Sequence, residues 1–466
     1  MKTKYILYAL FISIGTWSCD LMGNIDDIKP NYKQDEENAI HDTKTALQAV
    51  RGVYSGWTDW MLTAFRINMG VGIGSLSSSG AYSGEKGFSD NTVQADNDIL
   101  NDVYSALYNV INRANYVIAA VEGNADIAIP EGKKKEILGE SKFHRAMAHF
   151  YLLRYFGRFY DESSPYGIVI RKTPFRGSEI TARESVENAY TLIEQDLGYA
   201  ILNAPESPES HCFISRVTAQ ALLAKVLLSK GDYPGAATAA TAAIDAAADY
   251  GYELDDYANI FNNPYDSPEI LFAPYNDSHL CYYPERIRPS KSSLQLADDI
   301  MPGIGNDSTG AGLDPCYAFA FAKNNIKNNK NYNAKYPQES DQTTYYYLRL
   351  GEIYYISAEA EARQGAAHYE LARTRLQTVL DKHCGEGVYD VSGITDGKVL
   401  LETIRQHKWL ELLSENNEEW FDAIRYHKAG DLDISTIKPT LKTESQFILP
   451  IPKEAIAANN LLVPNP

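Results

Sequence analysis

The sequence lacks the short motifs that mark many catalytic and metal-binding sites. It has no H-E-x-x-H, no Walker-type phosphate loop and no G-x-S-x-G elbow. Its Gly-rich run Gly70–Gly74 misses the G-x-G-x-x-G spacing of a dinucleotide loop. We therefore predict no catalytic residue, no cofactor and no metal ligand. A pair of facing carboxylates, as a glycosidase needs, is neither found nor excluded among 61 acidic residues.

Positive charge is also in deficit. The chain carries 43 Lys and Arg against 61 Asp and Glu, which gives a formal net charge of −18. An acidic surface repels phosphate backbones and other anionic polymers, so nucleic acid is not an expected partner. Tyr, in contrast, is abundant, with 33 copies against 15 Phe. Its ring and hydroxyl suit wet contact surfaces, although ordinary packing accounts for most copies.

Long apolar runs are missing, and a short one stands at the N-terminus. Lys2 and Lys4 precede the apolar stretch Tyr5–Ile14, and small residues follow it. This pattern is typical of a secretory signal peptide, which we predict over 1–18. The stretch is too short to span a bilayer as a stable helix.

Cys19 follows the predicted signal peptide directly and is the expected site of lipid attachment. Thr16 and Trp17 depart from the usual lipobox, so ordinary cleavage beside an accidental Cys is the alternative. Acyl chains on Cys19 would anchor the protein firmly, because each buried methylene adds roughly 0.8 kcal/mol. The polar, acidic segment 19–41 is predicted to be a flexible tether.

Cysteine is scarce, with five copies in 466 residues. None lies in C-x-x-C or near a His at zinc-ligand spacing. Export makes disulfides possible, but the sequence assigns no pairs, and buried free thiols are equally compatible with it. The cysteines in question are Cys212, Cys281, Cys316 and Cys384.

Apolar periodicity predicts one mainly helical domain over 42–466. Asp42 is the expected N-cap of a first helix that runs to Trp60. The segment 69–98 is rich in Gly and Ser and has no helical period, so we expect a long loop. The segment 250–344 is rich in Asn, Asp, Pro, Tyr and Gly, and predicts a loop-rich insertion. Recognition usually resides on such loops.

Three segments resemble tetratricopeptide-type helix pairs. Small residues recur in them where two antiparallel helices cross closely, with a Gly in the turn between the helices. One pair, near 139–204, is split by an insertion. The other two lie near 215–248 and 345–382. Several matches together favour an α-helical repeat scaffold.

Two groups of chemically active side chains are interpreted as structural. His144 and His149 are five apart, about 140° around a helix, so they cannot share one metal ion. The pairs Asp298–Asp299 and Glu418–Glu419 are adjacent, and adjacent side chains on a helix diverge. We interpret these acidic residues as solvated surface positions.

Five ordered segments resemble the motifs of the SusD/RagB family. They are Tyr108–Ile118, Gly139–Arg158, Tyr346–Gly365, Ile404–His427 and Phe447–Pro466. In the second segment, Phe143, Arg145 and Ala146 stand at the family's F-x-R-A positions. The chain departs from the family pattern at Gln406–Lys408 and at Asn416–Asn417, and lacks the terminal Gly-Tyr. These departures concern the subfamily more than the family.

The resemblance implies a SusD-like fold that is mainly α, with tetratricopeptide-type helical repeats, irregular loop insertions and little β-structure. It implies a lipid-anchored, non-enzymatic protein on the outer face of the outer membrane of a Bacteroidota bacterium. Such a protein would capture an oligosaccharide or polysaccharide and deliver it to a SusC-like TonB-dependent transporter. The alternative within the family is RagB-type capture of peptides. A surface glycosidase is a third possibility.

In this family the ligand site is built from the loops after the first helices and from the mid-chain insertion. A pyranose has an apolar face and equatorial hydroxyls, so its site needs aromatic platforms and hydrogen-bonding side chains. The expected platforms are Trp57, Trp60, Tyr82, Tyr275, Tyr282 and Tyr283. The expected polar contacts are Asn276, Asp277, Arg286 and Arg288. The aromatic candidates lie in two aromatic-rich segments, Trp57–Tyr82 and Tyr275–Tyr283, and we expect these segments to converge in space.

Overall fold

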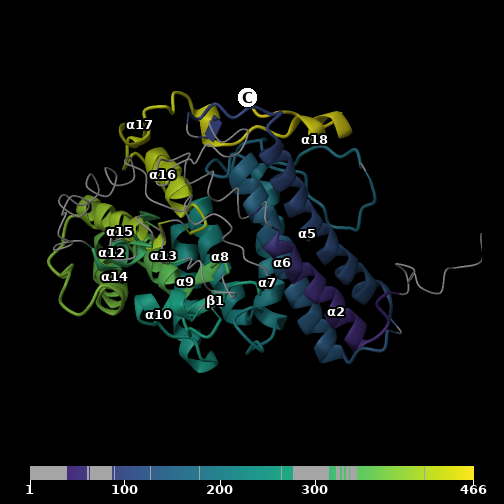
Figure 1. The fold of residues 1–466 in the computed structure, drawn as a ribbon, viewed down its shortest axis with the longest axis horizontal. Helices are drawn as coiled ribbons and strands as arrows, with labels where there is room; N and C mark the ends of the chain where they lie inside the picture. Colours follow the sequence, from purple (N-terminus) through teal and green to yellow (C-terminus); the bar gives the residue numbers. More distant parts are fainter. Residues whose placement is uncertain are drawn as a thin grey trace, which may run out of the picture.

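The structure, a computed structural model, is mostly helical with very little strand, which confirms the predicted mainly α SusD-like fold (Figure 1). It describes residues 39–59, 62, 87–88, 90–125, 127–177, 179–263, 265–275, 314–321, 326–327, 330–331, 335, 344–413 and 415–466. Within these ranges no helix is both long enough and apolar enough to cross a membrane.

The first described helix, α2 (Thr43–Tyr54), begins where the sequence predicts. The Asp42 carboxylate accepts a hydrogen bond from the Thr45 amide at 2.8 Å, which confirms Asp42 as the N-cap. The regular helix stops at Tyr54, and a 3₁₀ turn, η3 (Ser55–Thr58), follows it. The predicted helix to Trp60 is therefore too long, and η3 turns Trp57 into the core.

Two long helices form one side of the molecule with α2 (Figure 1). They are α5 (Asp98–Gly123) and α6 (Glu131–Phe156), and α2 packs against both. α6 is buried along most of its length, because α5 and α7 (Val186–Asn203) cover it from two sides. At Gly139 a Cβ would come within 2.6 Å of the Ala204 amide nitrogen. Only glycine permits this close approach at the end of α7.

The remaining scaffold helices pack largely in sequence order. α7 contacts α8 (Arg216–Lys230), α8 contacts α9 (Tyr233–Ala247), and α9 contacts α13 (Leu350–Ala362). α13 in turn packs against α14 (Tyr369–His383). This order of neighbours fits stacked helix pairs, and buried alanines let α8 and α9 approach closely: Ala221, Ala224, Ala236, Ala240 and Ala243.

Short elements complete the described chain. Helical ones are η4 (Ala248–Tyr250), α10 (Tyr257–Asn262), α12 (Pro315–Phe321), η6 (Ala366–His368), α15 (Gly397–Leu412), α16 (Glu418–Ala429), α17 (Ile434–Ile437), η7 (Glu444–Phe447) and α18 (Lys453–Ala458). Strand β1 (Ile270–Phe272) pairs antiparallel with β4 (Leu348–Arg349), and β2 (Ile326–Lys327) pairs with β3 (Lys330–Asn331). The pairing of β1 with β4 ties the mid-chain segment to the start of α13.

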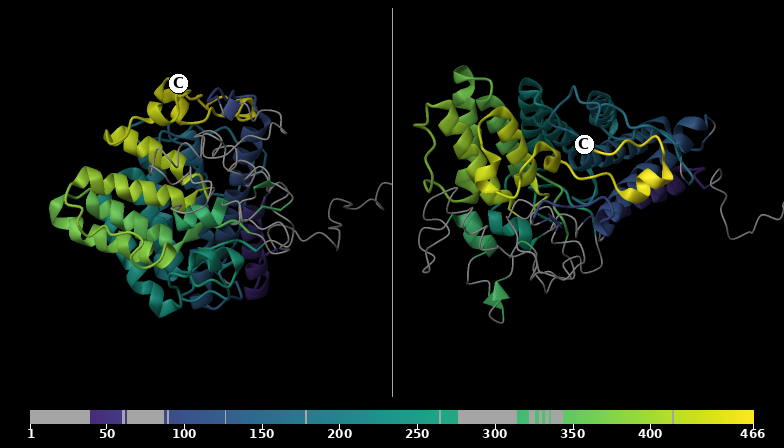
Figure 2. Two further views of the ribbon diagram at one scale, coloured as in Figure 1. Left: turned by 60° about the vertical axis from the view of Figure 1, so that its left-hand side comes forward. Right: turned by 90° about the horizontal axis from the view of Figure 1, so that it is seen from above.

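The end of the chain, residues 438–466, forms a C-terminal strap that crosses the molecule from α16 to α5 (Figure 2). The Leu449 amide donates to the Tyr155 carbonyl at 2.8 Å. The Lys453 amide donates to the Ala95 carbonyl at 2.7 Å. The Asn465 side chain donates to the Phe156 carbonyl at 3.0 Å. These bonds fix the strap across the C-terminal end of α6.

The expectation that Glu418 and Glu419 are solvated is wrong. They are 4% and 1% exposed, because the first turn of α16 lies against α6 and α8. Glu418 accepts a hydrogen bond from Arg154 Nη1 at 2.9 Å and pairs with Lys225 Nζ at 2.8 Å. It therefore bridges two buried cations, and Glu352 also pairs with Lys225. The pair Asp298–Asp299 lies outside the described residues.

Candidate ligand-binding site

Aromatic rings from four parts of the chain meet in the core, and two of them, Trp57 and Phe272, lie at or just before the start of the two aromatic-rich segments. We call this group the Trp57 cluster, and it consists of Tyr54, Trp57, His144, Tyr151, Phe272 and Tyr347. The ring centroids of Tyr54 and Phe272 are 5.9 Å apart, those of Trp57 and Tyr347 are 5.1 Å apart, and those of Phe272 and Tyr347 are 5.5 Å apart. Several contacts, such as those of Tyr54 with His144 and of Trp57 with Tyr347, are edge-to-face, an arrangement that aromatic quadrupoles favour.

The Trp57 cluster brings together the points at which the two segments leave the scaffold. Trp57 lies three residues before Trp60, and Phe272 lies three residues before Tyr275. The return of the second segment is fixed nearby, since Thr344 Oγ1 donates to the Pro274 carbonyl at 2.6 Å. Convergence of the two segments themselves stays a prediction, because most of their residues lie outside the described part of the chain.

Trp57 itself is not placed to stack on a ligand. Only 2% of the residue is exposed, and its indole N–H donates to His144 Nδ1 at 3.0 Å. The Tyr347 hydroxyl donates to the Trp57 carbonyl at 3.0 Å. With both faces packed and the N–H satisfied, the indole has no surface to offer a sugar. The structure therefore corrects the prediction for Trp57, whose ring is part of the core.

Tyr275 is the predicted platform that the structure describes as accessible. It is 58% exposed and lies just after β1. Its ring centroid is 5.5 Å from that of Tyr265, with the two planes inclined at 39°. The other candidates, and the lipid-attachment residue Cys19, lie outside the described residues: Trp60, Tyr82, Asn276, Asp277, Tyr282, Tyr283, Arg286 and Arg288.

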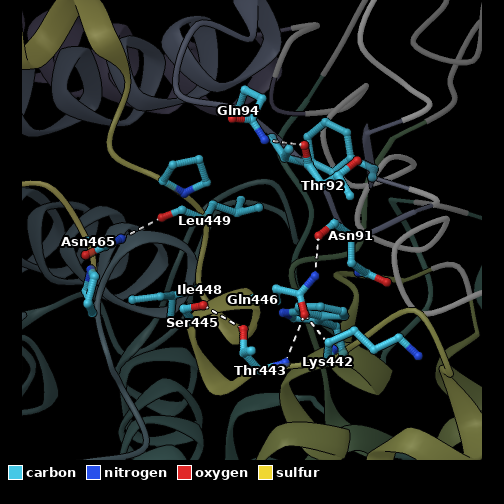
Figure 3. A pocket seen from close by; sticks show the side chains of 15 residues that line it. Asn91, Thr92, Gln94, Lys442, Thr443, Ser445, Gln446, Ile448, Leu449 and Asn465 are labelled. Carbon is cyan, nitrogen blue, oxygen red and sulfur yellow. Dashed lines mark hydrogen bonds between the residues drawn. The ribbon is translucent and has the colours of Figure 1, made fainter.

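A pocket that the sequence does not reveal lies under the C-terminal strap (Figure 3). We call this cavity of about 430 Å³ the amide pocket. Its polar lining consists mainly of neutral amides and hydroxyls, and Phe88 and Trp420 add apolar surface. The polar residues are Asn91, Thr92, Gln94, Lys442, Thr443, Ser445, Gln446 and Asn465.

Gln446 organises the amide pocket. Its Nε2 donates to the Asn91 carbonyl at 2.7 Å, and its Oε1 accepts from the amides of Lys442 and Thr443 at 2.6 and 3.0 Å. Asn91 has a φ of 54°, a left-handed conformation that Asn tolerates better than most residues. Gln446 lies 355 positions from Asn91, so no local sequence pattern could reveal their contact.

A larger cavity, of about 600 Å³, lies between α2, α6 and the segment after α7, and charged side chains line it. Glu140 is buried at its wall and accepts a hydrogen bond from the Tyr54 hydroxyl at 2.7 Å. Burial raises the pKa of Glu140 to about 7, although this hydrogen bond opposes the shift. In the lining, Arg51 lies 3.7 Å from Glu209, and Lys133 pairs with Glu136. A charged rim of this kind suits a neutral sugar less well than the amide pocket does.

On the other side of β1 lies a buried group of six charged residues, which we call the Arg349 cluster. It consists of Glu269, Lys335, Arg349, His383, Glu411 and Glu415, each at most 6% exposed. The Arg349 guanidinium contacts all three carboxylates, at 2.6 Å from Glu269, 3.2 Å from Glu411 and 2.8 Å from Glu415. Lys335 Nζ lies 2.7 Å from Glu415. The charges balance if His383 is protonated.

His383 lies between two carboxylates. Its Nε2 is 2.8 Å from Glu269 and its Nδ1 is 3.0 Å from Glu411. Burial by itself lowers the pKa of His383, but the charges of Glu269 and Glu411 outweigh burial and raise the pKa to about 10. A protonated imidazole donates from both nitrogens and has no lone pair for a metal.

This protonation decides whether the Arg349 cluster is a metal centre. One ligand atom each from Glu269, His383 and Glu411 lies within 4.8 Å of the others. A metal ion there would have to displace the proton of His383 and face the Arg349 guanidinium, which already neutralises the same carboxylates. The residues present therefore do not fit a metal ion. They fit a structural ion-pair network that attaches β1 to α14 and α15.

The described fold is a scaffold of stacked helices with very little strand, which defines a mainly α class of protein. Two family models match the chain. One, described as starch-binding associating with outer membrane, matches residues 28–228. The other, described as the SusD family, matches residues 317–466. The chain belongs to the SusD/RagB family.

Individual relatives agree with this assignment. The chain is 25% identical to "SusD-like protein P2" of Formosa agariphila over 426 residues, which cover 80% of this chain and 81% of that protein. A SusD superfamily protein from Bacteroides thetaiotaomicron has a TM-score of 0.74 at 21% identity, covering 91% of this chain and 100% of the other. A structure named "Laminarin binding SusD-like protein" has a TM-score of 0.66 at 21% identity, covering 93% and 100% of the two chains.

Proposed function

We propose that this protein captures oligosaccharides at the cell surface and delivers them to a SusC-like TonB-dependent transporter in the outer membrane. Membership of the SusD/RagB family supports the proposal, as does the laminarin-binding description of one structural neighbour. The observation that carries it is the common origin of the two aromatic-rich segments at the Trp57 cluster, with the exposed Tyr275 three residues after Phe272.

The chemistry of these surfaces suits a neutral sugar. An exposed tyrosine ring covers the apolar face of a pyranose, and its hydroxyl can bond to the sugar's hydroxyls. Tyr265 lies beside Tyr275, so the two rings offer a broader surface than a single platform. Apart from Lys442, the polar lining of the amide pocket is neutral, and the net charge of −18 disfavours an anionic ligand.

The surface location and the transporter are parts of the same proposal. The predicted signal peptide over 1–18 and the predicted lipid on Cys19 would place the protein on a membrane without a transmembrane helix. One matching family model is described as associating with outer membrane, which supports this placement. A lid on a transporter would then hold the glycan between the two proteins until it is taken up.

The test is calorimetric titration of the full chain with laminarin-derived and starch-derived oligosaccharides. Tyr275→Ala is expected to weaken binding of the recognised glycan about 30-fold, because truncating a contact aromatic typically costs ~2 kcal/mol. Leu202→Ala is the matched control, since Leu202 is also an exposed apolar side chain, at 72%. It should bind like the wild type. Affinity should also change little with salt, because a neutral ligand displaces few ions.

Different outcomes would move the site or change the ligand class. Wild-type binding by Tyr275→Ala, together with loss of binding by Gln94→Ala, would place the sugar in the amide pocket. Binding of short peptides but of no glycan would support RagB-type capture. Release of shorter sugars in proportion to protein concentration would make the protein an enzyme.

A further inference from the structure

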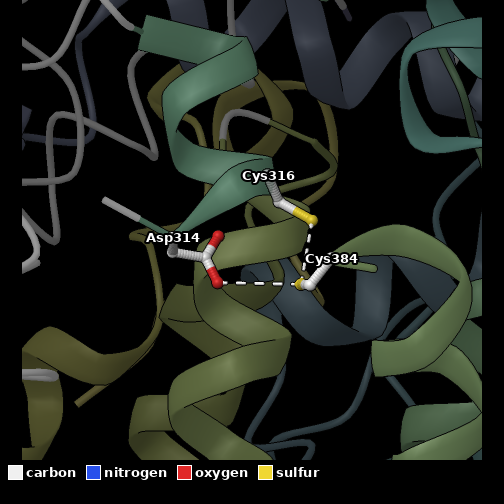
Figure 4. Close-up of side chains that lie close together, drawn as sticks. All are labelled: Asp314, Cys316 and Cys384. Atoms are coloured by element: carbon white, nitrogen blue, oxygen red, sulfur yellow. Dashed lines mark hydrogen bonds between the residues drawn. The ribbon is translucent and has the colours of Figure 1, made fainter. Parts of the chain in front are cut away.

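The short helix α12 brings a second cysteine against the end of α14 (Figure 4). Cys316 Sγ lies 3.6 Å from Cys384 Sγ, and the two residues are 2% and 7% exposed. The Cys384 thiol also faces the Asp314 carboxylate at 3.8 Å, and the Tyr389 hydroxyl donates to the same carboxylate at 2.9 Å. Two thiols from segments 68 residues apart are thus in direct contact inside the protein.

We propose that Cys316 and Cys384 form a disulfide bond in the exported protein. The proposal rests on the proposed function only in that it places the mature chain outside the cytoplasm, where disulfides persist. The oxidant is the disulfide of an exported thiol–disulfide oxidoreductase. One cysteine thiolate attacks it to give a mixed disulfide, and the second displaces the enzyme's thiolate. The two cysteines lose two electrons and two protons, and the oxidoreductase leaves as a dithiol.

The packing of α12 explains what the bond would do. The helix has seven residues, and a helix this short is marginal without tertiary support. Phe319 supplies part of that support, with its ring 5.8 Å from Phe261 and 5.7 Å from Tyr257. A small displacement of α12 is enough to bring the two sulfurs from contact to bonding distance. The disulfide would then attach α12 covalently to the end of α14.

The surroundings also dictate when the bond forms. Burial, followed by the neighbouring Cys384 and the Asp314 charge, raises the pKa of the Cys316 thiol well above its usual range. Because the thiolate is the reactive form, a docked Cys316 reacts slowly. Oxidation must therefore precede the docking of α12 during folding. Once formed, the bond is shielded, so mild reductants should not reach it in the native protein.

The same three side chains raise the question of a metal site. One ligand atom each from Asp314, Cys316 and Cys384 lies within 4.8 Å of the others. A structural zinc site has four ligand atoms, each at a fixed distance from the ion. Among the residues that the structure describes, this group offers three. A disulfide satisfies both sulfurs without a further ligand, so we favour it, and bound zinc is an outcome that the test distinguishes.

The experiment maps the cysteines of the full chain produced with its own signal sequence in a bacterium that exports it. Cells are lysed directly into denaturant that contains N-ethylmaleimide, so that buried free thiols are also blocked, and the protein is digested with trypsin without reductant. We expect a linked pair of peptides, 292–323 and 383–398, two hydrogens lighter than the sum of the separate peptides. Reduction should release both. Cys212, which is free, should carry the maleimide and serves as the internal control.

Thermal stability provides a second test of the proposed disulfide. Reduction under unfolding conditions, followed by refolding, should lower Tm by about 5 °C, because the bond closes a loop of 69 residues in the unfolded chain. The double variant Cys316→Ser, Cys384→Ser should lose this dependence on reductant. Cys212→Ser should keep it.

Three results would overturn the proposal: maleimide on both Cys316 and Cys384, a bond from either of them to Cys281, or one equivalent of zinc bound to the reduced pair. None of these results depends on whether the protein binds a glycan. Glycan titration therefore tests the proposed function separately. If the double variant fails to fold, the peptide map of the wild type still decides the question.

Discussion

The Trp57 cluster and the Arg349 cluster lie on either side of β1 and bury histidines in opposite states. His144 meets aromatic rings and one indole N–H, and burial lowers its pKa to about 3. His383 meets two carboxylates, and its pKa rises to about 10 despite equal burial. Burial alone therefore does not fix the charge of a core histidine. The partners that tertiary packing supplies decide it.

Both clusters attach β1 to the rest of the protein, one through aromatic ring contacts and the other through ion pairs. Phe272 of β1 is attached through ring contacts, and Glu269, just before β1, is attached through ion pairs. Ring packing tolerates the loss of one contact, because many small dispersion terms contribute. A buried ion network does not, because a removed partner leaves an uncompensated charge. This contrast makes the outcomes of substitution differ.

The largest effect is expected in the Arg349 cluster. Arg349→Met removes the cation shared by Glu269, Glu411 and Glu415, and should lower the free energy of unfolding by roughly 3–5 kcal/mol. Urea denaturation followed by circular dichroism measures it. The matched control is Arg51→Met, whose ion pair with Glu209 is exposed and should contribute less than about 1 kcal/mol. If both variants lost the same free energy of unfolding, the contrast between the buried and the exposed ion pairs would be wrong.

An intermediate effect is expected in the Trp57 cluster. Trp57→Phe keeps an aromatic ring but removes the hydrogen bond to His144 and leaves a small cavity, so it should cost about 2 kcal/mol. The same denaturation experiment measures the loss. Pairing the change with His144→Phe in a double-mutant cycle isolates the hydrogen bond. Strict additivity of the two changes would show that the bond contributes nothing.

The smallest effect on the free energy of unfolding is expected from a change of one pH unit. The folded pKa of His383, about 10, exceeds the unfolded value of about 6.5, so its contribution is complete below pH 6.5 and declines as pH rises. Between pH 7 and 8.5 the unfolding free energy should fall by at most ~1.4 kcal/mol per pH unit. His144 has the opposite sign, since its folded pKa of about 3 makes it lose stability as pH falls below 6.5.

Histidine resonances followed by nuclear magnetic resonance separate these two signs. The ring signals of His383 should keep the shifts of a charged imidazole at pH 8, and those of His144 should keep the shifts of a neutral ring at pH 5. His383→Gln and His144→Gln assign the two signals. If either histidine titrated near pH 6.5 in the folded protein, the charge state assigned to that histidine would be wrong.

Several features were predictable because they depend on local sequence. The N-cap at Asp42 follows from capping chemistry and the mainly helical class follows from periodicity, and the structure contains both. The prediction that Glu418 is solvated is wrong because adjacency to another acidic residue on a helix does not imply exposure. The side chain instead meets Arg154, 264 positions earlier in the chain. No local pattern carries that contact.

The candidate site also has some features that the sequence indicates and others that only the folded chain creates. Composition selects Tyr275 as a candidate platform, and its ring is exposed just after a short apolar strand, but its contact with a ligand stays a prediction. Composition could not distinguish Tyr275 from Trp57, which is equally aromatic but follows a helix whose last turn tightens to 3₁₀ and directs the indole inward. The contact between Gln446 and Asn91 in the amide pocket also needed the folded strap.

The sequence by itself determined the mainly helical class and the family, because periodicity, capping and ordered motifs are properties of neighbouring residues. Tertiary structure alone decided which aromatic rings are buried, which charges are paired and which cysteines meet. These outcomes depend on residues tens to hundreds of positions apart, such as Cys316 and Cys384 or Trp57 and His144. Their contact exists only after the chain has buried its apolar surface.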